Sequence, residues 1–225
     1  MENAKHTICV ITRYRETDFS WLPNLIRFVD KVIIYNKGEN DILINNDKVS
    51  IINLPNVGRI DHTIAYHITS NWDNLSDNIV FIPASIYMCR NKGRYLDAIC
   101  KRINTVNHYK GFYGPRFYRV NSTYNYSIDD YQAEGNCNKN GNKFIKSTFK
   151  DLQEWKNALI DTRPIRYIAM RGMFIVNKEN IKYIDKQIYI NLLESLSVGD
   201  NIENGHFAER IWAHLFRQYS FDKLK

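Results

Sequence analysis

Long apolar runs are missing from this 225-residue chain. No stretch approaches the ~18 consecutive apolar residues that a membrane helix needs, so the sequence predicts no membrane span. The N-terminus has neither the long apolar region nor the small-residue cleavage site of a secretory signal. Apolar residues make up 44% and charged residues 24% of the chain, as in globular proteins rather than disordered ones. The length suffices for a core without disulfides.

Cysteine is scarce, and its spacing forms no known framework. The four cysteines are Cys9, Cys89, Cys100 and Cys137, and no two of them form a CxxC pair. This pattern fits neither a zinc knuckle nor a set of disulfides. We therefore expect four reduced cysteines in a cytoplasmic protein.

Two familiar phosphate-binding motifs are also missing, because the chain has neither a Walker A loop nor a GxGxxG fingerprint. The formal net charge is nevertheless +7 and the pI is near 9.1. Lys and Arg are scattered singly rather than gathered in a tail. This favours a globular protein with a local pocket for an anion over a basic arm that binds nucleic acid.

Apolar periodicity predicts short strands that alternate with helices. Expected strands cover residues 6–12, 32–35, 49–54 and 79–82, and expected helices cover 19–30, 60–72, 91–108, 150–160, 180–196 and 205–219. Residues 111–142 are expected to be irregular, and 167–176 to form a strand interrupted at Arg171-Gly172. No internal repeat is found. The pattern predicts one α/β domain over residues 1–225, with a mostly parallel sheet flanked by helices.

Ligands of such sheets bind beyond the carboxyl ends of the strands, where this chain has four polar segments: 12–16, 36–38, 56–61 and 83–87. Gly58 and Arg59 lead from a strand directly into a helix. Glycine allows close approach of a ligand, and a helix N-terminus with an arginine suits a phosphate. The alternative is a capped turn with a solvated arginine.

The other candidates also have structural alternatives. Arg13 and Arg15 could be solvated loop charges, and Asn36-Lys37 could be a simple turn. His67 lies on an apolar helix face, which favours a core histidine, whereas His62 lies off that face and could point at a cleft. Asp129-Asp130 is an adjacent carboxylate pair that could bind a divalent cation or stand in a solvated loop.

Glu209 lies at the edge of the apolar stripe of the last helix, which runs from Phe207 to Phe216. A carboxylate at the edge of a well-anchored helix is held rigidly at the rim of a cleft, as a general base requires. A solvated Glu209-Arg210 pair explains the spacing equally well.

Four segments, in this order, carry a resemblance: WLPNLIRFVDKVIIYNKG, NLPNVGRIDHTIAYHITSNWDNLSDNIVFIP, RGMFIVNKENI and GHFAERIWAHLF. They resemble a family of viral, fungal and bacterial proteins classed as a domain of unknown function and regarded as glycosyltransferase-like. The likeness spans about residues 7–217. It implies a GT-A-type, Rossmann-like domain that binds a nucleotide-sugar donor.

On this resemblance, each candidate receives an expected role. The nucleoside of the donor would be bordered by Thr12, Arg13, Arg15, Asn36 and Lys37, with Ser85 also on the donor side. Gly58 and Arg59 would face the diphosphate, and Arg171 and Gly172 would border the acceptor. Glu209 would be the catalytic base, with His62 as the next candidate.

One departure concerns the metal. Metal-dependent members of the GT-A class carry Asp-x-Asp after the strand that here is 79–82, where this chain has Pro83-Ala84-Ser85. Three possibilities stay open: Arg and Lys replace the metal, Mn²⁺ or Mg²⁺ is held by Asp129 and Asp130, or only binding remains.

The sequence thus predicts a glycosyltransferase, of inverting stereochemistry, that acts on a glycan or other hydroxyl acceptor in the cytoplasm, or in the host cytoplasm for a viral protein. The alternative is a non-catalytic nucleotide- or sugar-binding protein. A nucleic-acid-binding protein, suggested by Lys110, Arg116 and Arg119 among the tyrosines of 109–131, ranks lowest, and no nucleic-acid partner is expected.

Overall fold

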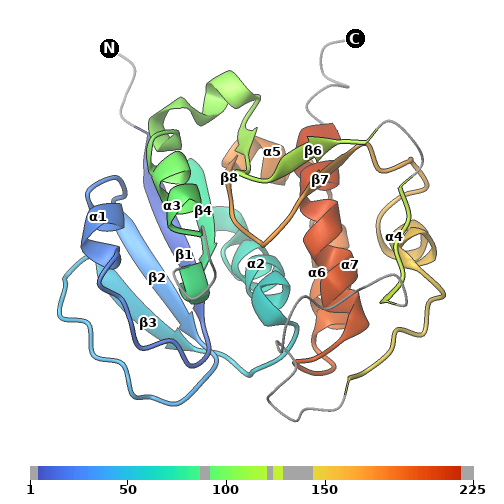
Figure 1. The fold of residues 1–225 in the computed structure, drawn as a ribbon. Helices are drawn as coiled ribbons and strands as arrows, with labels where there is room; N and C mark the ends of the chain where they lie inside the picture. The colour runs from blue at the N-terminus through green and yellow to red at the C-terminus, as the bar shows by residue number, and fades with distance from the viewer. Residues whose placement is uncertain (1–4, 87–91, 121–123, 129–143, 219–225) are drawn as a thin grey trace.

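A computed structural model describes residues 5–86, 92–120, 124–128 and 144–218 (Figure 1). Four of the strands in its main sheet are parallel: β1 (Thr7–Arg13), β2 (Lys31–Asn36), β3 (Val49–Asn53) and β4 (Asn78–Pro83). Their order is β3-β2-β1-β4, so the direction of winding reverses between β1 and β4. In an open α/β sheet, this reversal is where ligands bind.

Two antiparallel steps extend the sheet beyond β4. Strand β8 (Phe174–Asn177) pairs antiparallel with β4, and β5 (Phe112–Tyr113) pairs antiparallel with β8. Phe174 lies opposite Phe81, so β8 begins at the edge where the parallel strands end. A separate two-stranded sheet consists of β6 (Phe117–Arg119) and β7 (Tyr167–Ala169).

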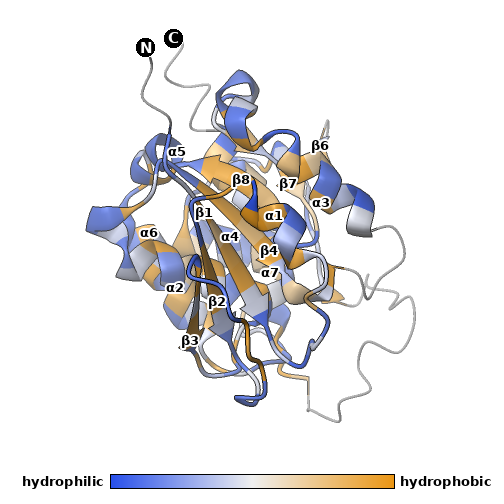
Figure 2. Ribbon diagram, turned by 90° about the vertical axis from the view of Figure 1, so that its left-hand side faces the viewer, coloured by the Kyte–Doolittle hydropathy of each residue, from blue (hydrophilic) through white to orange (hydrophobic). Residues whose placement is uncertain are grey.

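Helices cover both faces of the sheet. On one face, a buried cluster joins residues such as Ile8 and Phe81 to α2 (Arg59–Ser70), α4 (Leu152–Leu159), α5 (Lys178–Lys182), α6 (Lys186–Leu196) and α7 (Glu203–Ala213). On the other face, Cys9 and Val80 pack with α1 (Leu22–Ile26), α3 (Lys92–Cys100) and the 3-10 segment Ile103–Tyr109. Adjacent residues of a strand therefore belong to different clusters, as the period of two requires. Figure 2 shows a hydrophobic sheet among helices with hydrophilic outer faces.

These observations confirm the expected α/β fold with a mostly parallel sheet flanked by helices. The four parallel strands start and end within two residues of the predicted bounds, and so does α2. None of the described helices has the length and apolarity to cross a bilayer. Cys9 and Cys100 are free thiols, while Cys89 and Cys137 lie outside the described residues.

Several predicted helices are wrong in length. The helix expected over 19–30 is only α1, because Pro23 fixes its start and Asp30 already bonds to Thr7 of β1. The helix expected over 91–108 divides into α3 and the 3-10 segment, and that over 180–196 divides into α5 and α6, since the Asp185 side chain caps a new helix. The last helix becomes a π-helix over His214–Gln218.

The predicted irregular stretch 111–142 is wrong at its start, where β5 and β6 form. The predicted interruption at Arg171-Gly172 is confirmed, and it separates two strands that belong to different sheets. Short connections of this kind bring β7, Arg171 and β8 to the carboxyl edge of the parallel strands.

Candidate functional site

A strained turn connects β3 to α2 at the carboxyl edge. Gly58 (φ 56°) and Arg59 (φ 55°) both adopt the left-handed conformation. A Cβ on Gly58 would lie 2.3 Å from the carbonyl oxygen of Leu196, so only glycine fits here. The Gly58 N–H donates to the carbonyl of Gly199 at 2.7 Å, which fixes the turn to the segment after α6.

Lys37 braces this turn from the end of β2. Its Nζ lies 2.5 Å from the carbonyl oxygens of both Val57 and Arg59, and 3.5 Å from Nδ1 of His62. Only 5% of Lys37 is exposed, and burial lowers its pKa to about 7, with Asp61 opposing the shift. Lys37 therefore supports the turn from within rather than facing solvent.

The start of α2 offers hydrogen-bond donors. The first bond within the helix runs from the His62 N–H to the Gly58 carbonyl at 2.9 Å. The N–H groups of residues 59–61 precede that bond and have no acceptor inside the helix. The exposed Arg59 side chain, whose Nη1 lies 3.3 Å from Nε2 of His206, adds positive charge beside these donors. Backbone donors with an adjacent guanidinium suit an anion.

A second strained turn, between β7 and β8, packs against Ile60, the residue that follows the first turn. Arg171 (φ 78°) and Gly172 (φ 58°) are both left-handed. A Cβ on Gly172 would lie 2.7 Å from Cγ2 of Ile60, so glycine is needed for α2 to pack this closely. Oε1 of Glu209 accepts a hydrogen bond from the Arg171 N–H at 2.6 Å. The structure thus brings together both predicted glycine–arginine pairs and the predicted base.

Two carboxyl groups have different environments here. Glu209, on α7, is 22% exposed, and its Oε2 lies 3.5 Å from Nη1 of Arg210. Asp61 is 2% exposed and accepts a 2.7 Å bond from Nε1 of Trp212. Burial, and then the nearby charge of Glu209, raises the pKa of Asp61 to about 7. Glu209 is consequently the more accessible of the two carboxyl groups, and the bond from Trp212 to Asp61 holds α7 against α2.

Sequence reasoning missed Asp61. Its only local signal was an acidic residue in the first helical turn directly after Gly58-Arg59, which usually indicates a favourable contact with the helix dipole.

His62 is buried rather than directed into an open cleft. It is 4% exposed and stacks on Tyr66 with ring centres 6.2 Å apart. Burial, and then the charge of Lys37, lowers the pKa of His62 to about 4. A neutral His62 follows, with Nδ1 directed at Lys37. His67, expected in the core, is buried and bonds the Tyr35 hydroxyl at 3.0 Å.

The predicted nucleoside-binding residues of β1 and β2 are mostly engaged inside the protein. The Arg13 side chain is 1% exposed, and its guanidinium donates to Asn36 and to the carbonyls of Glu16 and Glu39, besides pairing with Asp41 at 2.7 Å. These contacts hold the loop after β2 against the end of β1.

Three further predicted donor-side residues have different settings. The amide of Asn36 donates within the same loop and to Asn53. Oγ1 of Thr12 is buried and has no partner among the described residues. Arg15 is exposed, with its guanidinium 4.8 Å from the centre of the Tyr14 ring. Contact of these residues with a nucleoside stays a prediction.

The segment after β4 does not fit a divalent cation. Ser85 is half-buried in the 3-10 turn Ala84–Ile86, which supplies no carboxylate. Over the described ranges, no three His, Cys, Asp or Glu side chains gather closely enough to hold a metal ion. Asp129 and Asp130 lie outside the described residues.

Comparison with known proteins leaves the family open. No protein-family model matches the chain, and no curated protein matches its sequence.

Proposed function

We propose that the protein is a glycosyltransferase of GT-A type that transfers a sugar from a nucleotide-sugar donor to a hydroxyl acceptor. The observation that carries this proposal is the packing of the Arg171-Gly172 turn against Ile60, directly after the Gly58-Arg59 turn, with the Glu209 carboxylate bonded to the Arg171 N–H. Backbone donors that suit an anion and an accessible carboxylate therefore lie near each other, at the edge of the sheet where ligands of α/β sheets bind.

The strand order supports the same reading. The order β3-β2-β1-β4 matches the first four strands of a doubly wound dinucleotide-binding sheet, in which the reversal point lies between β1 and β4. The N-terminus of α2 stands at the carboxyl end of β3 and can receive a diphosphate.

The chemistry assigns one role to each group. Glu209 takes the proton of the acceptor hydroxyl as its oxygen attacks the anomeric carbon. The bond from that carbon to the diphosphate oxygen breaks, and the nucleoside diphosphate leaves with the electron pair. The N–H groups of residues 59–61 and the Arg59 guanidinium stabilise its negative charge. Among the described carboxyl groups beside these turns, Glu209 is accessible and Asp61 is buried, which favours a single base and inversion at the anomeric carbon.

A non-catalytic binding protein is the second candidate, and one contact favours it. Because Oε1 of Glu209 already accepts the Arg171 N–H, support of the strained turn would by itself explain this carboxylate. Hydrolysis of the donor distinguishes the two functions.

The experiment is a thermal-shift screen of nucleotide sugars, with and without Mn²⁺, followed by donor hydrolysis without acceptor. A ligand at 100 times its Kd adds about 2.7 kcal/mol of stability, which raises the melting temperature by roughly 5 °C or more. Unphosphorylated nucleosides are the matched control and should give smaller shifts. A transferase binds a donor and hydrolyses it slowly, a binding protein only binds it, and absence of any shift contradicts both.

A further inference from the structure

Four arginines lie on the small β6–β7 sheet or next to its ends, and Lys110 precedes β5 of the main sheet. Residues 109–120 and 164–171 contain no Asp or Glu, and their cations are Lys110, Arg116, Arg119, Arg166 and Arg171. The two segments pair antiparallel, with Arg119 opposite Tyr167. This part of the protein therefore carries a large share of the +7 net charge.

One end of this sheet lies beside Glu209. Arg116 interacts electrostatically with Glu209 and Tyr95, and its Nε donates to the Tyr118 hydroxyl at 2.9 Å. The Arg171 guanidinium carbon lies 5.8 Å from the centre of the Tyr95 ring. Two arginines and two tyrosines thus border the side of Glu209 on which the acceptor is expected.

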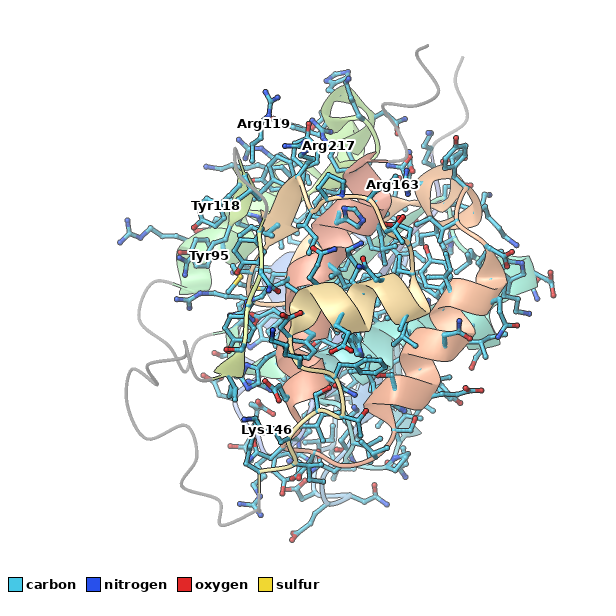
Figure 3. All side chains as sticks on the ribbon, turned by 90° about the vertical axis from the view of Figure 1, so that its right-hand side faces the viewer. Tyr95, Tyr118, Arg119, Lys146, Arg163 and Arg217 are labelled. Carbon is cyan, nitrogen blue, oxygen red and sulfur yellow. The ribbon has the colours of Figure 1, made fainter. Side chains whose placement is uncertain are left out.

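The other end of the sheet forms an open cavity of about 410 Å³, lined by Arg119, Val120, Arg166 and Tyr167. Arg119 and Arg166 are exposed, and neither guanidinium has a hydrogen-bond or ion-pair partner in the described part of the chain. The three-residue strand β6 separates the two ends by roughly 10 Å. Figure 3 shows Tyr95, Tyr118 and Arg119 along one side of the molecule.

Some other cations of the described residues are held in ion pairs. Lys178 contacts Asp77 at 2.8 Å, and Arg163 contacts Asp161 at 2.7 Å. Two unpaired guanidinium groups that line one cavity are suited to carboxylate or phosphate, which they bind through two parallel hydrogen bonds.

We propose that this surface binds an anionic oligosaccharide, bearing carboxylate or phosphate groups, as the acceptor of the transferase. We call it the arginine strip, and it consists of Tyr95, Arg116, Tyr118, Arg119, Arg166 and Arg171. The acceptor role rests on the proposed function. The terminal hydroxyl would lie at Glu209, and the anionic groups further along the chain would bind Arg119 and Arg166.

The aromatic rings favour a sugar over nucleic acid. Single-stranded nucleic acid binds by stacking its bases on open aromatic faces. Here the guanidinium carbons of Arg116 and Arg171 lie 5.9 and 5.8 Å from the ring centres of Tyr118 and Tyr95. Each ring therefore already has a guanidinium beside it, so the strip offers charged forks rather than open stacking surfaces.

The test is calorimetric binding of hexagalacturonate, a phosphorylated pentamannose, neutral maltohexaose and a short oligothymidine. The variant Arg119→Gln/Arg166→Gln removes the two exposed charges without changing the core. The matched control is Arg27→Gln/Lys31→Gln, which removes two exposed cations beside α1. We expect at least one anionic sugar to bind, with a Kd about tenfold higher in the strip variant and unchanged in the control.

The two anionic probes distinguish carboxylate from phosphate. Equal binding of maltohexaose, equal affinity of the strip variant, or tighter binding of oligothymidine would overturn the proposal. Donor hydrolysis by the unaltered protein is measured separately. Strip-dependent binding without hydrolysis retains the anionic-sugar surface and rejects the transferase, whereas hydrolysis without strip-dependent binding rejects the anionic acceptor alone.

Discussion

Replacement of Glu209 separates its two possible roles. In Glu209→Gln, the amide oxygen can still accept the Arg171 N–H, which is now bonded at 2.6 Å. The unfolding free energy should therefore change by less than about 1 kcal/mol. The negative charge is lost, so a variant that lacks the base should turn over roughly a hundred- to ten-thousand-fold more slowly, with donor affinity nearly unchanged.

Glu209→Ala adds the structural test. It leaves the Arg171 N–H without its acceptor, which costs about 1–3 kcal/mol for a buried donor. Because Arg171 is left-handed (φ 78°), the turn also loses a contact that holds a strained residue in place. In a protein of this size, each kcal/mol lowers the melting temperature by roughly 2–4 °C.

Both variants are compared with the wild-type protein by urea unfolding and steady-state turnover. The control is Glu194→Gln, which makes the same chemical change at an exposed position of α6. Full turnover in a folded Glu209→Gln protein refutes the role of Glu209 as catalytic base. If Glu209→Ala is as stable as Glu209→Gln, the Glu209 carboxylate does not stabilise the Arg171-Gly172 turn.

Gly58→Ala should lower the free energy of unfolding in urea by roughly 2–4 kcal/mol, because the new Cβ meets the Leu196 carbonyl. The control Gly114→Ala, whose Cβ would lie 3.4 Å from its nearest neighbour, should lower it far less. Equal losses in the two variants would contradict the close approach at Gly58. Arg59→Ala should weaken donor binding by roughly 1.5–3 kcal/mol in calorimetry and change the free energy of unfolding by no more than about 0.5 kcal/mol. The control Arg27→Ala should change neither donor binding nor stability. Burial lowers the pKa of His67 to about 4, below its unfolded value of 6.5. Between these two pH values the His67 ring stays neutral in the folded protein but gains a proton in the unfolded chain. Stability should hence fall as the pH drops from about 6.5 to 4, and His67→Gln should reduce this fall, whereas the exposed His6→Gln should not.

The main strands and α2 could be predicted from sequence because they are continuous apolar runs or clear amphipathic periods. Strands β5 and β6, two and three residues long, carry no period and form only because β8 and β7 lie beside them. The alternative of a solvated Glu209-Arg210 pair is wrong for Arg210, which is 5% exposed because Tyr124 and Tyr126 cover it, the latter with its ring centre 3.6 Å from the guanidinium carbon.

The candidate site could be predicted only in parts. Gly58-Arg59, Arg171-Gly172 and Glu209 were each recognisable from residue type and position. Their contact depends on tertiary packing of α2 and α7, which no local spacing encodes. The internal roles of Arg13 and Lys37 were equally inaccessible, because their partners lie in loops far along the chain.

A crystal structure of the protein with the nucleotide sugar that stabilises it most tests the central claim directly. We expect the diphosphate within hydrogen-bond distance of the N–H groups at the start of α2, with the Arg59 guanidinium beside it and the anomeric carbon toward Glu209. A nucleotide bound elsewhere, such as in the cavity between Arg119 and Arg166, would contradict it.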